Sequence, residues 1–124
     1  MIKKSILIID DDIILLKTAE EILSDLYSVS VAKGGKQGIA LLKKEIIPNL
    51  ILLDIAMPEM DGYEATRMIH EMDLNIPIVA MTANAFMEDK MKAKKAGMNA
   101  HVSKPLDKDI LIRVISKLCG YKSV

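Results

Sequence analysis

Short apolar runs alternate with segments of helical periodicity along the whole chain. Most of the runs are rich in branched apolar residues, as expected of buried strands, and one alternates between apolar and polar positions. The predicted strands cover residues 5–9, 28–32, 50–53, 76–81 and 100–102. Each is three to six residues long, which suits strands better than helices.

Between these strands, apolar residues recur at the three- and four-residue spacing of an amphipathic helix. The helical patterns cover residues 15–26, 39–46, 65–72, 83–96 and 110–119. Pro48 ends the second pattern, because proline cannot continue a helix. Gly97 follows the fourth pattern and provides a left-handed cap.

This order of elements predicts an α/β fold built from five strand–helix pairs, written (βα)5. The strands are apolar on both sides, as strands covered by helices on both faces should be. Right-handed crossovers leave few topologies for such a doubly wound parallel sheet, and the flavodoxin-like strand order 2-1-3-4-5 is the common one. We therefore predict a single flavodoxin-like domain over residues 1–124.

Composition narrows the class of protein. Apolar residues make up 51% of the chain, which argues against disorder. Lysine plus arginine equals aspartate plus glutamate, at 17 each, so the charge indicates no direct contact with nucleic acid. Cys119 is the single cysteine, which excludes an internal disulfide and fits a reducing compartment. No apolar run reaches the roughly 18 residues of a membrane span, so we expect a cytoplasmic protein with no direct membrane contact.

Isolated polar residues follow the predicted strands at the point where each one ends. Asp10 and Asp11 follow the first strand, Asp54 the third, Thr82 the fourth and Lys104 the fifth. Ligands of open α/β sheets bind outside the carboxyl ends of the strands, and adjacent strands lie about 4.8 Å apart. We therefore expect these five side chains to line one small cleft.

The chemistry of this set is restrictive. Three carboxylates in one cleft favour a hard divalent cation with oxygen ligands, and so few ligands favour Mg²⁺ over Ca²⁺. Mg²⁺ keeps several waters and binds phosphate oxygens, while a lone lysine suits a phosphoryl oxygen as a point charge. A carboxylate can also act as a nucleophile and form an aspartyl phosphate.

Each residue also has a purely structural interpretation when taken alone. Asp12 begins a helix, where an acidic side chain is favoured by the helix dipole. Asp10 or Asp11 could equally cap that helix, and Thr82 could cap the fourth. A lone Asp54 at a strand end is commonly a turn residue. The five strand-end residues together are hard to explain in this way.

The motifs around these residues resemble those of the response-regulator receiver domains of two-component signalling. They are IIDDD after the first strand, LILLDIAMPEMDG around the third, MTANAF after the fourth and AHVSKP around the fifth. The resemblance extends over essentially the whole chain. The segment TANAFMEDKMKAKKAGMNAHVSKPLD is most similar to receivers attached to hybrid histidine kinases.

The resemblance implies a role for each matching residue. Asp54 is the expected phosphoacceptor, and Asp10 and Asp11 are expected to bind Mg²⁺ with it. The backbone carbonyl of Ala56 is expected to be a further metal ligand. Lys104 is expected to pair with the phosphoryl group.

The resemblance also implies a switch. Thr82 is expected to provide the hydroxyl group that moves in this switch, and Ala83 is the small residue expected beside the phosphate. The peptide bond before Pro105 is expected to be cis. Phosphorylation is expected to reshape the surface of the fourth helix, fifth strand and fifth helix, where a homodimer would also form. His101 stands at the switch position of the fifth strand, where the family usually has tyrosine or phenylalanine.

The implied reaction is phosphoryl transfer from a phosphohistidine on a histidine kinase or histidine phosphotransfer domain. The protein would catalyse its own phosphorylation and dephosphorylation without turning over a separate substrate. Ala56 and Asn84 would flank the attacking water during hydrolysis. Because Ala56 is small, we predict a phosphoryl group that is not unusually long-lived.

Two other interpretations stay open. A phosphohydrolase of the haloacid-dehalogenase type also uses an aspartate nucleophile, but it needs a second aspartate where this chain has Ala56. A degenerate receiver would serve only as an interaction surface. The complete set of site residues argues against that second alternative.

Overall fold

A computed structural model of the chain describes residues 3–83 and 87–120, without the side chains of residues 87–89. The described strands are β1 (Ser5–Ile9), β2 (Ser28–Ala32), β3 (Leu50–Asp54), β4 (Ile78–Thr82) and β5 (Ala100–Ser103). The described helices are α1 (Ile13–Leu23), α2 (Gly35–Lys43), α3 (Gly62–Glu71), α4 (Met87–Lys95) and α5 (Lys108–Cys119).

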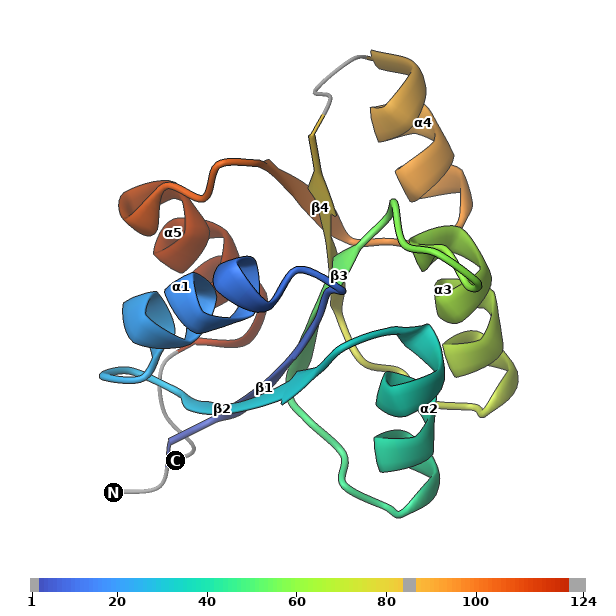
Figure 1. The fold of residues 1–124 in the computed structure, drawn as a ribbon, viewed down its shortest axis with the longest axis horizontal. Helices are drawn as coiled ribbons and strands as arrows, with labels where there is room; N and C mark the ends of the chain where they lie inside the picture. The colour runs from blue at the N-terminus through green and yellow to red at the C-terminus, as the bar shows by residue number, and fades with distance from the viewer. Residues whose placement is uncertain (1–2, 84–86, 121–124) are drawn as a thin grey trace.

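The five strands form one parallel sheet in the order β2-β1-β3-β4-β5. Helices α1 and α5 cover one face of this sheet, and α2, α3 and α4 cover the other (Figure 1). The register places Ile9 beside Leu53 and Asp54 beside Met81, so the strands end near the same level. The predicted fold class and strand order are confirmed.

Two hydrophobic cores explain why the strands are apolar on both sides. Successive side chains of a strand point to opposite faces of the sheet. In β1, Ile6 and Ile8 therefore join the core under α1 and α5, whereas Leu7 and Ile9 join the core under α2 and α3. The residues of β3 divide between the two cores in the same way.

Helix α2 is shorter than its apolar pattern predicts. It ends at Lys43, and Glu45 adopts a left-handed backbone with φ of 63°. The N–H of Glu45 donates to the carbonyl of Leu42, and the N–H of Ile46 donates to that of Leu41. This pair of bonds is a Schellman motif, which closes the helix before Ile46 and leaves the Ile46 side chain half exposed.

Strand β4 begins at Ile78, two residues later than predicted, because Pro77 has no N–H to give to a ladder. The Ile78 N–H donates instead to Asn99 Oδ1 at 2.9 Å. Gly97 has φ of 96° and closes α4, as its position predicts. The start predicted for this helix falls partly on residues 84–86, which lie outside the described residues.

None of the helices in the described part of the chain has the length and hydrophobicity that crossing a membrane requires.

Candidate functional site

The carboxyl ends of β1, β3 and β4 bring the predicted site residues to one edge of the sheet. Asp10 directly follows β1, and its N–H donates to the Ala32 carbonyl of β2 at 3.1 Å, which continues the ladder by one residue. Asp54 and Thr82 are the last residues of β3 and β4. The Lys104 N–H donates to the Thr82 carbonyl at 2.8 Å, so Lys104 lies beside the end of β4.

Three carboxylates converge at this edge. One oxygen from each of Asp10, Asp11 and Asp54 lies within 4.8 Å of the others. Asp10 is fully buried and Asp54 is 3% exposed, whereas Asp11 faces solvent. The cluster is therefore open on the Asp11 side and closed on the side of the sheet.

Lys104 binds both buried carboxylates. Its Nζ lies 2.9 Å from Asp10 Oδ2 and 3.3 Å from Asp54 Oδ1. Among the residues that the structure describes, no other cation forms an ion pair with these two aspartates. One ammonium thus pairs with two of the three carboxylates, and Asp11 has no ion pair with it.

Backbone amides hold the two buried carboxylates in place. The Asp12 N–H donates to Asp10 Oδ1 at 2.9 Å, and the Ala56 N–H donates to Asp54 Oδ1 at 3.2 Å. Asp12 itself caps α1, because its Oδ1 accepts from the N–H groups of Ile14 and Leu15. The structural interpretation of Asp12 is confirmed, and neither Asp10 nor Asp11 is the cap of α1.

Burial and charge shift the protonation equilibria of the site. Burial raises the pKa of Asp54 above its usual value and the charge of Asp10 adds to this, although the Ala56 N–H and Lys104 pull it down. Burial alone would lower the pKa of Lys104, but the hydrogen bond to Asp10 and the charges of Asp54 and Asp10 raise it overall. Lys104 is therefore an ammonium at neutral pH.

This donor set fits a divalent cation. The three carboxylates supply hard oxygen ligands, and Lys104 alone leaves an excess of negative charge in a partly buried cleft. Mg²⁺ needs only one or two carboxylates and fills its remaining positions with waters and phosphate oxygens. Asp10, Asp11 and Asp54 are the residues that could hold it.

The other predicted residues lie around this cluster. Ala83 is exposed directly after Thr82, and the Lys104–Pro105 peptide bond is cis. His101 lies in β5 opposite Ala80 and is half-buried. Asn84 lies outside the described residues.

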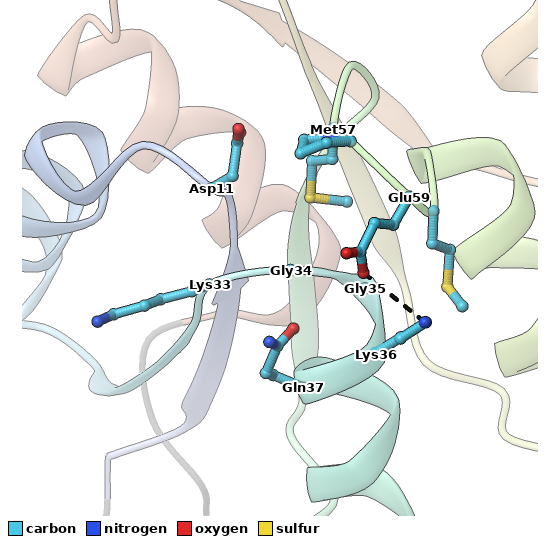
Figure 2. Close-up of a pocket in the computed structure, with 10 residues that line it drawn as sticks. Asp11, Lys33, Gly34, Gly35, Lys36, Gln37, Met57 and Glu59 are labelled. Carbon is cyan, nitrogen blue, oxygen red and sulfur yellow. Dashed lines mark ion pairs between the residues drawn. The ribbon is translucent and has the colours of Figure 1, made fainter.

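A cavity of about 180 Å³ beside the carboxylates has no counterpart in the sequence-based prediction. It lies between the start of α2 and the loop that joins β3 to α3 (Figure 2). Its lining residues are Asp11, Lys33, Gly34, Gly35, Lys36, Gln37, Met57, Pro58, Glu59 and Met60. The sequence shows the Gly34–Gly35 pair only as a break between two elements; that it packs against the distant loop follows from the fold.

Comparison with known proteins gives consistent matches. A family profile described as the response regulator receiver domain matches residues 6–116. An uncharacterized 14.6 kDa protein of Leptolyngbya boryana is 37% identical over 117 residues, which are 92% of this chain and 88% of that protein. The sensor histidine kinase RcsC of Salmonella typhimurium is 35% identical over 112 residues, covering 90% of this chain but 12% of the kinase.

Hybrid signal transduction histidine kinase I of Dictyostelium discoideum is 34% identical over 98% of this chain and 8% of the kinase. The chain thus spans about a tenth of these kinases. Among solved structures, the receiver domain of sensor histidine kinase PA1611 from Pseudomonas aeruginosa superposes with a TM-score of 0.82 at 33% identity, over 94% of this chain and 98% of that one. That structure has a magnesium ion coordinated in its active site cleft. The Vibrio cholerae chemotaxis protein CheY4 shares the fold with a TM-score of 0.86 at 24% identity, over 93% of this chain and 98% of that one.

Proposed function

Because the chain belongs to the response regulator receiver domain family, we propose that residues 1–124 form one phosphoacceptor domain of a phosphorelay, with Asp54 as the acceptor. The observation that carries this proposal is the position of Asp54. Its carboxylate is buried, lies within 4.8 Å of two other carboxylates and contacts the Lys104 ammonium at 3.3 Å. A residue that served only in a turn would not need to be buried beside two other carboxylates and an ammonium group.

The proposed reaction is a transfer between two carriers. A carboxylate oxygen of Asp54 attacks the phosphorus of a partner's phosphohistidine, and an oxygen–phosphorus bond forms. The phosphorus–nitrogen bond breaks, and its electron pair stays on the departing imidazole. Lys104 remains an ammonium throughout and pairs with a phosphoryl oxygen, and the Thr82 hydroxyl donates to another.

The negative charge of the site supports a role for Mg²⁺ in this transfer. Asp10, Asp11, Asp54 and the backbone carbonyl of Ala56 would hold the ion. When bound, it would neutralise charge that develops on the phosphoryl oxygens. The protein's own contribution is to hold Asp10 and Asp54 by the amides of Asp12 and Ala56 before the donor arrives.

The switch is proposed to begin at Thr82. This buried residue ends β4, and α4 is the next helix in the chain, so a movement of its hydroxyl toward the phosphate would be passed to that helix. The affected surface consists of α4, β5 and α5 and includes His101. Exposed apolar side chains on it, Met91 and Ile110, suit a surface that binds a partner or a second copy.

The proposed donor is a histidine kinase or a histidine phosphotransfer domain, and the proposed location is the cytoplasm. The relatives support the choice of donor, because several of them are hybrid histidine kinases. The protein is proposed to act without direct contact to nucleic acid or membrane, in keeping with its formal net charge of zero.

Intact-protein mass spectrometry after incubation with acetyl phosphate tests this function. We expect the wild type to gain one phosphoryl group in Mg²⁺ and none in EDTA. Asp54→Ala should gain none, whereas Asp12→Asn should react like the wild type because asparagine also caps helices. Failure of the wild type to react alongside a functional receiver would refute the proposal.

A further inference from the structure

The first turn of α2 packs against the loop that joins β3 to α3. Figure 2 shows Gly34 and Gly35 on one side of the cavity, with Met57 and Glu59 of the loop facing them. This loop begins directly after the acceptor Asp54 and carries Ala56. Its position therefore bears on the geometry of the site.

Gly35 leaves the room that Met60 of this loop occupies. A Cβ atom at position 35 would lie 2.7 Å from Met60 Sδ, 3.0 Å from its Cγ and 3.2 Å from its Cβ. The Met60 side chain thus runs closely along the backbone of α2, and it is buried. A methyl group at position 35 would displace Met60, because non-bonded carbon atoms pack at about 3.5–4.0 Å.

The other end of the loop is fixed by Gly62, the first residue of α3. A Cβ at position 62 would lie 2.6 Å from the carbonyl oxygen of Asp54 and 2.7 Å from Cα of Ile55. The Gly62 N–H also donates to the Ile55 carbonyl at 3.2 Å. The loop is thus held against α3 beside Asp54 and against α2 at Met60.

A second link between α2 and the loop is weak. Lys36 Nζ lies 3.7 Å from Glu59 Oε2, and both side chains are largely exposed. Ion pairs of this kind contribute about 0–1 kcal/mol and are screened by salt. The buried contact of Met60 with Gly35 is therefore a stronger link between α2 and the loop than this ion pair.

The geometry points to Gly35 as a positioning residue for the acceptor site, acting through Met60 on the loop that carries Ala56. This inference rests on the proposed function, since Ala56 matters only if its carbonyl is a metal ligand. Gly35 does not touch the reacting atoms. Its effect is to let the loop approach α2 closely enough to present the Ala56 carbonyl toward the cluster of Asp10, Asp11 and Asp54.

Isothermal titration calorimetry with MgCl₂ tests the inference without any phosphoryl donor. We expect Gly35→Ala to bind Mg²⁺ about tenfold more weakly than the wild type, because replacing a residue that orients a metal ligand commonly weakens metal binding by that much. Its free energy of unfolding in EDTA should also fall somewhat, because the added methyl group displaces Met60 from its buried position. A purely structural role would lower that free energy and leave the affinity for Mg²⁺ unchanged.

Gly34→Ala is the matched control. Its backbone is extended, and a Cβ there would meet only the end of the Gln37 side chain, at 2.8 Å, which is free to move aside. We expect its affinity for Mg²⁺ to equal that of the wild type. A loss as large as that of Gly35→Ala would overturn the inference, because the effect would then not be specific to the contact with Met60.

A double-mutant cycle with Met60→Ala completes the test. Met60→Ala removes the contact and should itself weaken Mg²⁺ binding, and Gly35→Ala should then add nothing further. Additive losses, or wild-type affinity in Gly35→Ala, would overturn the inference while leaving the proposed function intact. A wild type that binds no Mg²⁺ would overturn both.

Discussion

Replacing Asp54 with asparagine should stabilise the folded protein in the absence of metal. The ion pair that is lost is the longer of the two made by Lys104, at 3.3 Å, and the 2.9 Å pair with Asp10 remains. An amide oxygen can still accept from the Ala56 N–H. The substitution removes the buried negative charge of Asp54 beside that of Asp10. We therefore expect the free energy of unfolding to rise by about 0.5–2 kcal/mol.

The dependence of this gain on pH follows from the raised pKa of Asp54. An acid whose pKa is higher in the folded state stabilises that state only while it is protonated, and this stability is lost as the pH rises through the folded-state pKa. The advantage of Asp54→Asn should therefore be complete at neutral pH. It should shrink as the pH falls through the folded-state pKa of Asp54.

Urea denaturation in EDTA, followed by circular dichroism, measures the difference. Asp12→Asn is the control, since it removes an exposed charge and keeps the cap of α1. Adding Mg²⁺ at about 100 times its dissociation constant should stabilise the wild type by about 2.7 kcal/mol and the variant by less. The difference in free energy of unfolding between the variant and the wild type should then shrink or change sign.

A variant less stable than the wild type at neutral pH in EDTA would refute this reasoning. It would mean that the pair with Lys104 outweighs the burial of the Asp54 charge. A gain no larger than that of Asp12→Asn would refute it equally, because the effect would then come from overall charge.

Three further predictions concern single residues of the site and of the turn that closes α2. Lys104→Met should lower the free energy of unfolding in EDTA by about 3 kcal/mol, measured in urea, because it leaves Asp10 and Asp54 buried without a cation. Glu45→Gly should raise it by about 1 kcal/mol, because glycine adopts a left-handed backbone without the strain that φ of 63° imposes on glutamate; no gain would contradict this. Ala56→Arg should slow hydrolysis of the phosphorylated protein, followed by intact mass, because a long side chain would shield the phosphate that alanine leaves open; an unchanged rate would contradict this.

The order of the strands could be predicted from the sequence because every strand is a separate apolar run. Parallel strands between helices leave few arrangements, so five runs were enough to predict the order β2-β1-β3-β4-β5. The convergence of Asp10, Asp54 and Lys104 follows from the same rule, since each stands at the carboxyl end of a strand. These features depend on local pattern and on topology alone.

The end of α2 could not be predicted in this way. Ile46 continues the apolar spacing of the helix, and Pro48 provides a later stop. The helix ends earlier because Glu45 adopts a left-handed backbone. A glycine at this position would have predicted that conformation, whereas a glutamate does not. The exact end was decided by the backbone hydrogen bonds of Glu45 and Ile46, which leave no mark in the sequence.

The difference between Asp10 and Asp11 is also a property of the fold. The two residues are chemically identical neighbours, yet one is fully buried and the other is exposed. The ladder bond from the Asp10 N–H to Ala32 keeps Asp10 in the sheet, where its carboxylate meets Lys104, and the chain turns away at Asp11. A carboxylate already paired with Lys104 has less freedom to bind a metal directly than an exposed one does. The site is therefore asymmetric, with Asp10 paired to the protein's own cation and Asp11 on the open side. The proposed metal and phosphodonor would approach from that side.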